Sequence, residues 1–145
     1  MMRYFDSSVL LKLYLSEPQT TTAIRLFRDA QTSPPFTRLH GVEIRGAFQQ
    51  KCGRGELSQG ECAQLIAILE SDLQSAVFTQ PVVQWNETFD RAETLTAAHA
   101  SETLCRTLDV LHVATAVALG ADEFCTFDHR QAAMASAAGL NLVTE

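Results

Sequence analysis

The sequence lacks the features of membrane, secreted and zinc-binding proteins. No apolar run approaches the ~20 residues that a membrane-spanning helix requires, and the opening MMRYFDSS reaches an acid before any long apolar stretch, so we expect no secretory signal. The cysteines at positions 52, 62, 105 and 125 form no C-x-x-C pair and no cluster with histidine, which argues against a disulfide framework and against structural zinc. We therefore expect a cytoplasmic protein with free thiols that does not contact a membrane.

An excess of basic charge is also missing. The chain has 11 Lys and Arg against 17 Asp and Glu, which gives a net charge of −6. A domain that holds nucleic acid by bulk charge alone usually has a pI above about 9. The composition excludes that mode of binding, but it allows an enzyme that meets a phosphodiester through a bound metal. With 145 residues, 46% of them hydrophobic, the chain has the size and apolar content of a single packed domain, residues 1–145.

The hydropathy pattern alternates between strands and helices. Strands are expected at residues 2–5, 33–37, 77–83, 123–127 and 140–143. Helices are expected at residues 9–15, 18–30, 39–52, 59–73, 85–100, 103–119 and 129–138, with a capping box from Ser58 to Glu61. Prolines fall in the second and third strand segments, so these are expected to be short or broken. The alternation predicts an α/β fold with a mainly parallel sheet covered on both faces, and its ligand at the carboxyl ends of the strands.

The helix predicted around DVLHVATAVAL is apolar on nearly every side, which is typical of a buried helix. Asp109 and His112 are its only ionisable residues. A buried carboxylate is unfavourable unless it is paired, hydrogen-bonded or bound to a cation. Asp109 therefore either pairs with Arg106, three residues earlier, or binds a cation. We expect His112 to be a hydrogen-bonded helix residue, with contact to a phosphate or water as the alternative.

Two further acids follow predicted strands directly, where an open α/β sheet binds its ligand. Asp6 comes after the first strand and Asp128 after the strand at residues 123–127. Asp6 has an alternative role as a helix cap that competes with Ser7, although we expect Ser7 or Ser8 to be the N-cap. On the helix expected at residues 39–52, Val42, Ala47 and Phe48 are expected to point inward. Glu43 lies near the border of that buried face, and on its own such a glutamate is ordinarily a solvated residue.

Four carboxylates in one site would raise one another's pKa unless divalent cations neutralised them. Mg²⁺ and Mn²⁺ prefer such hard oxygen ligands, and Mg²⁺ commonly binds a substrate phosphate as well. The chemistry implied is metal-assisted hydrolysis of a phosphodiester, with two cations balancing four carboxylates.

Three stretches give these acids a shared context. The first is F-D-S-S-V-L-L-K-L-Y around Asp6, and the second is the L-x-x-x-E that ends at Glu43. The third, residues 104–140, reads LCRTLDVLHVATAVALGADEFCTFDHRQAAMASAAGL. With the four acids in this order, essentially the whole chain resembles the PIN-domain family, and within it the VapC-type toxins of toxin–antitoxin pairs.

The resemblance implies a three-layer fold with a five-stranded parallel sheet, strand order 3-2-1-4-5, flanked by helices. It implies that Mg²⁺ or Mn²⁺ is held by the acidic quartet Asp6, Glu43, Asp109 and Asp128. Ser7 and Thr126 would orient ligands or water, a role that suits short hydroxyl side chains beside strand-end acids. Nearby bases would contact RNA phosphates, and the candidates are Arg38, Arg45 and Arg106.

The activity implied is endonucleolytic cleavage of single-stranded RNA by the toxin of a toxin–antitoxin pair, inhibited by a cognate antitoxin and acting as a homodimer. An alternative within the same fold is a catalytically inactive module that binds RNA or protein. A haloacid-dehalogenase-like phosphatase is disfavoured because the position of its second acid is Ser8 here. A response-regulator receiver domain is disfavoured because Asp6 has no acidic neighbour and no lysine follows Lys51.

Overall fold

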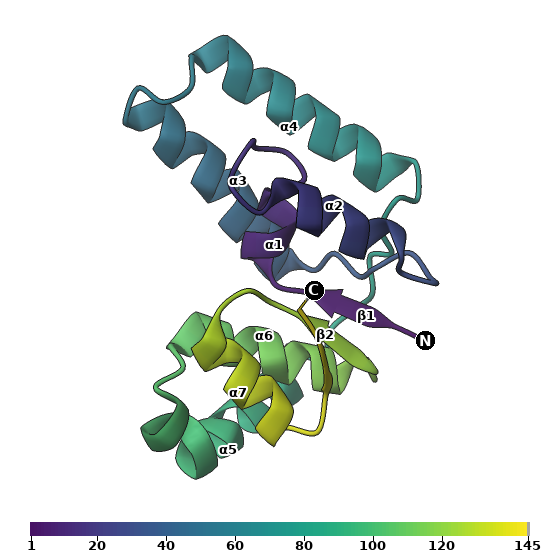
Figure 1. Ribbon diagram of the computed structural model, residues 1–145, viewed down its shortest axis with the longest axis vertical. Coiled ribbons are helices and arrows are strands. Elements are labelled where there is room, and N and C mark those ends of the chain that lie inside the picture. The colour runs from purple at the N-terminus through teal and green to yellow at the C-terminus, as the bar shows by residue number, and fades with distance from the viewer. Residues whose placement is uncertain (145) are drawn as a thin grey trace.

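The computed structural model describes residues 1–144 of the chain (Figure 1). Its strands are β1 (Arg3–Phe5), β2 (Glu123–Cys125) and β3 (Asn141–Val143). Its helices are α1 (Ser7–Leu11), α2 (Thr20–Arg28), α3 (Arg38–Gly53), α4 (Gln59–Gln74), α5 (Trp85–Thr103), α6 (Thr107–Ala118) and α7 (His129–Ala137). None of the helices described is long and apolar enough to cross a membrane.

The three strands form a parallel sheet in the order β1-β2-β3. Phe5 is in register with Cys125, and the backbone N–H of Asp6 donates to the carbonyl of Cys125 at 3.0 Å. The strand-end residues Asp6 and Thr126 are therefore neighbours at the carboxyl edge of the sheet. The parallel α/β class expected from the sequence is confirmed.

The prediction of five strands in the order 3-2-1-4-5 is wrong for the described residues. The segments 33–37 and 77–83 meet only in an isolated parallel bridge between Pro35 and Thr79. Two hydrogen bonds join the segments, from Phe36 N to Thr79 O at 2.7 Å and from Thr79 N to Pro34 O at 2.9 Å. Prolines have no N–H to donate to a ladder, so the pairing stops after one bridge.

A histidine side chain satisfies part of the open edge of β1. The Thr37 backbone N–H donates to Nδ1 of His40 at 2.9 Å, so Nε2 carries the hydrogen and donates to the carbonyl of Phe5 at 2.8 Å. Burial, together with nearby His112, lowers the pKa of His40 to about 3. The neutral imidazole thus replaces a hydrogen bond that a neighbouring strand would have made.

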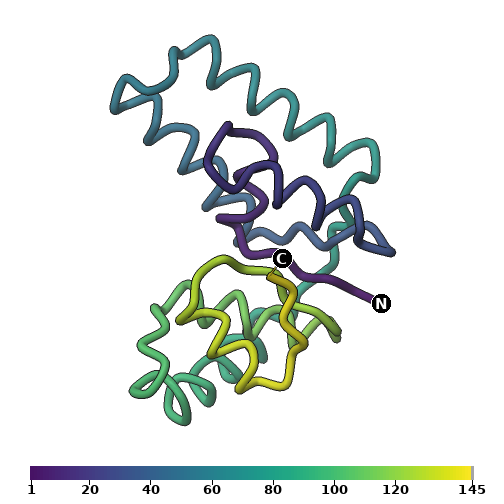
Figure 2. Tube along the Cα trace, viewed as in Figure 1, coloured from purple at the N-terminus to yellow at the C-terminus, as the bar shows by residue number. Residues whose placement is uncertain are grey.

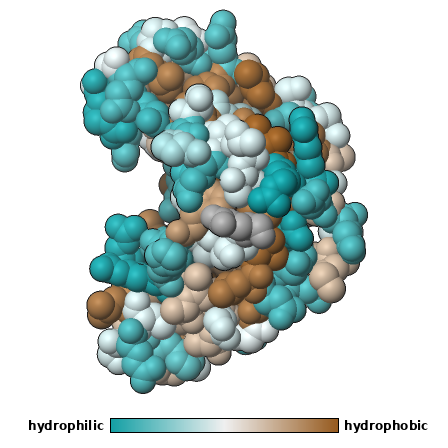
Figure 3. All heavy atoms as spheres, viewed as in Figure 1, coloured by the Kyte–Doolittle hydropathy of each residue, from teal (hydrophilic) through white to brown (hydrophobic). Residues whose placement is uncertain are grey.

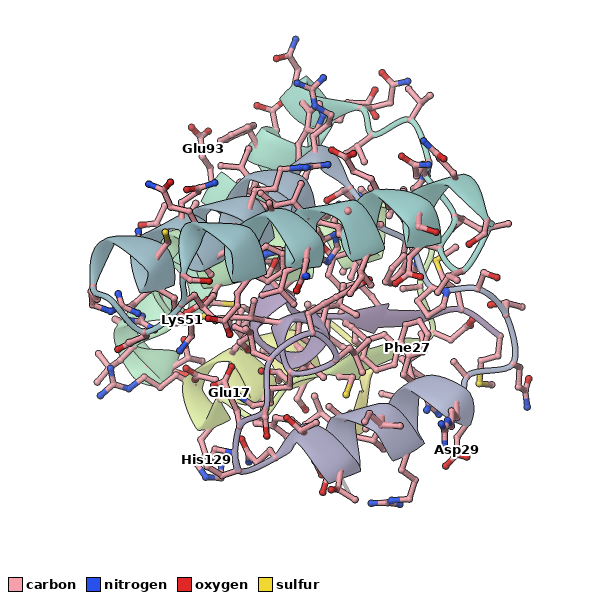
Figure 4. All side chains as sticks on the ribbon, turned by 90° about the horizontal axis from the view of Figure 1, so that it is seen from above. Glu17, Phe27, Asp29, Lys51, Glu93 and His129 are labelled. Carbon is pink, nitrogen blue, oxygen red and sulfur yellow. The ribbon has the colours of Figure 1, made fainter. Side chains whose placement is uncertain are left out.

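Helices cover both faces of the sheet and create two cores. Helices α1 to α4 lie on one side and α5 to α7 on the other, and the chain passes between the two groups after α4 (Figures 1 and 2). Because successive residues of a strand point to opposite faces, Phe5 and Cys125 enter the core under α1–α4, whereas Tyr4 and Phe124 enter the core under α5–α7. In Figure 4, Phe27 lies between α2 and α4, where its ring contacts those of Phe5 and Phe78.

Two helices differ from their predicted form. Helix α3 buries His40, Ile44 and Phe48, so Val42, which we expected to point inward, lies on the opposite side and is 72% exposed. The helix predicted for residues 103–119 begins only at Thr107, because Leu104 adopts a left-handed φ of 57° and ends α5. The capping box from Ser58 to Glu61 is confirmed at the start of α4.

Candidate active site

Asp6 is a buried carboxylate at the point where β1 turns into α1. It is the N-cap of α1 and accepts from the backbone N–H of Ser8 at 3.1 Å and from the Ser8 hydroxyl. The expectation that Ser7 or Ser8 would be the N-cap is therefore wrong, because the Asp6 carboxylate accepts the backbone N–H of Ser8 at the start of the helix. Burial by itself would raise the pKa of Asp6, but electrostatic interaction with His112 and the donors around the carboxylate outweigh it, and the pKa lies below its ordinary value. Asp6 is thus held ionised.

Glu43 reaches the site from α3 and contacts residues of α1 and α6 there. Its Oε1 accepts from the Ser7 hydroxyl at 2.9 Å and contacts Nε2 of His112. His112 is fully buried, and its Nδ1 lies 2.6 Å from the hydroxyl of Tyr4. With the imidazole hydrogen on Nε2, His112 donates to Glu43 and accepts from Tyr4. His112 Nε2 also lies 3.9 Å from Oδ1 of Asp6, so this hydrogen-bonded histidine lies between two of the predicted acids.

Asp109 lies in the first turn of α6, with its side chain 20% exposed. Its Oδ2 is 3.4 Å from Nε of Arg106, so the pairing that we considered as an alternative is present, although the Arg106 side chain is 77% exposed. Burial raises the pKa of Asp109, the charges of Asp6 and Asp128 raise it further, and Arg106 only partly offsets them. Three carboxylates from different elements are therefore close enough to repel one another.

Asp128 ends the segment after β2 and caps α7. Its Oδ1 accepts from the backbone N–H groups of Arg130 at 2.8 Å and Gln131 at 3.0 Å, while its own N–H donates to the Thr126 hydroxyl at 3.0 Å. A pocket of about 180 Å³ opens beside Asp128 and Thr126, between the turn before α2 and the start of α7. Figure 3 shows a notch in the surface between the part of the molecule that carries α3 and α4 and the part that carries α5 to α7.

Gln131, a fully buried residue of α7, is not among the site residues predicted from the sequence. Its Nε2 donates to Oδ1 of Asp6 at 2.9 Å and to the backbone carbonyl of Asp109 at 3.2 Å. Its Oε1 accepts from the Thr126 hydroxyl at 2.6 Å. The available signal was a polar residue one turn before Met134, on the apolar face of a short helix.

The predicted RNA-contacting bases are separated in space. Arg106 lies beside Asp109, whereas Arg38 and Arg45 line a different pocket of about 440 Å³ on α3, which none of the four acids lines. Arg45 also pairs with Glu70 at 3.3 Å. Of the three bases, Arg106 is therefore the one that the structure places next to the acids.

The chemistry of the acids fits a divalent cation, although their side chains do not form a ready ligand cluster. Carboxylate oxygens are the ligands that Mg²⁺ and Mn²⁺ prefer, and the mutual repulsion that raises the pKa of Asp109 would be relieved by a cation. Within residues 1–144, however, no group of three or more His, Cys, Asp or Glu side chains is arranged to hold a metal ion. Binding would require Asp6 and Glu43 to share their oxygens with, or release them from, the internal donors described above.

Comparison with known proteins gives structural matches. No protein-family model and no curated protein sequence matches the chain. VapC20 from Mycobacterium tuberculosis, a toxin that cleaves the sarcin–ricin loop, is 19% identical, with a TM-score of 0.68 over 95% of each chain. VapBC2 from Rickettsia felis, bound to a DNA fragment from its promoter, is 12% identical, with a TM-score of 0.70 over 99% of this chain and 98% of that one. FitAcB from Neisseria gonorrhoeae is 15% identical, with a TM-score of 0.63 over 97% and 96%.

These identities define a shared fold. The chain has the α/β fold of VapC-type toxin structures along nearly its full length. The resemblance to VapC-type PIN toxins that the sequence suggested is thereby confirmed at the level of the fold.

Proposed function

We propose that this protein is a metal-dependent endoribonuclease that hydrolyses phosphodiester bonds of single-stranded RNA as the toxin of a toxin–antitoxin pair. The observation that carries the proposal is the approach of Asp6, Asp109 and Asp128, from three separate elements, to one carboxyl edge of the sheet. Acids gathered there, whose repulsion the exposed Arg106 only partly offsets, form a site for a cation rather than for an anion. The shared fold with a toxin that cleaves the sarcin–ricin loop supports RNA as the substrate.

The chain's own residues would hold and orient the reacting groups. Asp6, Glu43, Asp109 and Asp128 would bind Mg²⁺ or Mn²⁺, which supplies an activated water nucleophile at neutral pH and stabilises charge on the phosphate. His112 and the Ser8 donors keep Asp6 ionised, and the Ser8 donors also fix its carboxylate. Arg106, which is exposed beside Asp109, would contact a phosphate of the bound strand.

Hydrogen bonds from inside the protein orient the glutamate. Ser7 and His112 contact the same oxygen of Glu43, which leaves the second oxygen of that carboxylate without a hydrogen bond from either residue. Tyr4 in turn fixes the ring of His112. Thr126 connects Asp128 to α7 through its hydroxyl, so both hydroxyl residues named from the sequence act on the acids that we propose as ligands.

The proposal includes a protein partner. VapBC2 from Rickettsia felis is bound to a DNA fragment from its promoter. By analogy, we propose that this chain binds a cognate antitoxin and acts as a homodimer in the cytoplasm. Co-expression with the product of a neighbouring reading frame should yield a complex in which the ribonuclease activity is suppressed. Purification of a toxin that remains fully active in the presence of that product would contradict the pairing.

The nuclease proposal is tested by incubating the purified protein with single-stranded RNA and Mg²⁺ or Mn²⁺. We expect cleavage in the presence of either metal, and we expect EDTA or the Asp109→Asn substitution to abolish it. Cleavage that survives both treatments would mean a different mechanism.

A second candidate is a catalytically inactive RNA-binding or protein-interaction module with the same fold. The observation in its favour is that the described side chains form no ready metal cluster, because each of the four acids already contacts another residue of the chain. Such a module would bind single-stranded RNA with equal affinity before and after addition of EDTA and would leave the RNA intact.

A further inference from the structure

Gln131 links the elements that carry three of the proposed metal ligands. Its side chain joins the end of β1, through Asp6, to the first turn of α6, through the carbonyl of Asp109. Its backbone N–H donates to Asp128. Although the residue lies on α7, its amide therefore joins the carboxylate of Asp6 to the backbone of Asp109, which is far from Asp6 in the sequence.

The orientation of the amide follows from its neighbours. The Thr126 hydroxyl accepts the backbone N–H of Asp128, so its own hydrogen is free to be donated to Gln131. The atom of Gln131 that faces Thr126 must then be the carbonyl oxygen Oε1. This leaves the NH₂ group facing Asp6 and the Asp109 carbonyl, and its two hydrogens have one acceptor each.

A neutral donor at this position can bond to Asp6 without changing the charge of the site. A lysine or arginine would also bond to Asp6, but its charge would compete with a cation for the carboxylate. A methionine of similar size would fill the same space without donating a hydrogen bond to Asp6, so packing alone does not require an amide. Gln131 satisfies one oxygen of Asp6 while leaving the negative charge of the site unchanged.

We propose that Gln131 is a positioning residue that holds Asp6 against the first turn of α6, so that the strand-end acid and the helical acid can share one divalent cation. This inference rests on the proposed function, because it assigns the role through the metal site. A residue that orients a metal ligand in this way typically changes metal affinity by about 10- to 100-fold when it is replaced.

The test compares Gln131→Met, which keeps the volume and removes the donor, with Gln131→Asn, which keeps the amide but shortens it. Gln64→Met, at an exposed position of α4, is the matched control. For each protein without RNA, Mn²⁺ affinity is measured by calorimetry and thermal stability by circular dichroism. Cleavage of single-stranded RNA then gives kcat and KM at saturating and at limiting Mn²⁺.

We expect both Gln131 variants to bind Mn²⁺ about 10- to 100-fold more weakly, to lose activity at limiting Mn²⁺ with an unchanged KM for RNA, and to recover part of it at saturating Mn²⁺. Gln64→Met should behave as the wild type. A folded Gln131 variant with wild-type Mn²⁺ affinity overturns the inference, as does unfolding of both variants, which would give Gln131 a purely structural role. Asp109→Asn is measured in parallel. If the wild type binds no Mn²⁺ and cleaves no RNA, the proposed function itself fails.

Discussion

Replacing Asp109 with asparagine should inactivate the protein and, at the same time, stabilise it. The carboxylate is partly buried and is repelled by Asp6 and Asp128, and these effects hold its pKa above the ordinary value of 3.8. In the absence of a cation, the ionised side chain therefore opposes folding. Asparagine has the same shape and no charge, so it removes the repulsion while it also removes a proposed metal ligand.

The expected size of the stabilisation follows from two opposing contributions. The lost ion pair with Arg106 is worth only about 0–1 kcal/mol, because the Arg106 side chain is 77% exposed. Relief of burial and like-charge repulsion should exceed this, and substitutions of this kind at functional sites commonly add about 0.5–2 kcal/mol to the free energy of unfolding. For a chain of this length, we expect the melting temperature to rise by about 2–4 °C per kcal/mol. Cleavage of RNA should fall by at least about 100-fold.

The pH dependence tests the cause of this stabilisation. Because the folded-state pKa of Asp109 is raised, its unfavourable contribution is present above that pKa and disappears as the pH falls through it to below 3.8, where the carboxyl group is protonated in both the folded and the unfolded state. The difference in free energy of unfolding between Asp109→Asn and the wild type should therefore shrink in acid.

Urea denaturation without divalent metal at several pH values measures this difference, with Asp90→Asn, an exposed acid of α5, as the control. A variant that is less stable than the wild type at neutral pH, or a difference that does not change with pH, would mean that the ionised Asp109 does not oppose folding.

Four further substitutions test other parts of the structure. Tyr4→Phe leaves the buried Nδ1 of His112 without a partner and should lower the free energy of unfolding by about 1–3 kcal/mol in urea denaturation; no change would mean that this hydrogen bond does not form. Because the pKa of His40 is lowered to about 3, the neutral imidazole contributes fully to stability above pH 6.5, and this contribution is lost as the pH falls toward 3. The free energy of unfolding of His40→Asn should therefore fall less over that pH range than that of the wild type. An equal fall in the two proteins would contradict this. Val42→Asp, at a 72% exposed position, should change the free energy of unfolding by less than about 0.5 kcal/mol. Ile44→Ala should lower the same free energy by about 2–5 kcal/mol. A larger loss for Val42→Asp than for Ile44→Ala would assign α3 a different buried face.

Much of the site could be predicted from the sequence because its acids follow local rules. Asp6 comes directly after β1 and Asp128 shortly after the end of β2 at Cys125, and parallel strands end at one edge of a sheet. Asp109 is the one acid in an otherwise apolar helix, which marks it as a group that needs a partner. These patterns depend on neighbouring residues, so they are visible without knowledge of the fold.

The features that the sequence did not predict depend on tertiary contacts. Glu43 and Val42 are adjacent in α3, and only the packing of His40 and Ile44 decides which of them faces the interior. The role of Gln131 arises from hydrogen bonds to residues 22 and 125 positions earlier in the chain. The prolines explain from the sequence why the segments at residues 33–37 and 77–83 form only one bridge. That the His40 side chain supplies a hydrogen bond to the open edge of β1 could be found only from the structure.

The most direct test of the account is a calorimetric titration of the purified protein with Mn²⁺ in the absence of RNA. If the acids of β1, α3, α6 and the start of α7 form one cation site, the wild type will bind Mn²⁺ saturably, and the double variant Asp6→Asn/Asp109→Asn will show no binding although it remains folded. Wild-type protein that does not bind Mn²⁺, or a double variant that binds it as well as the wild type, would mean that these acids do not form one cation site.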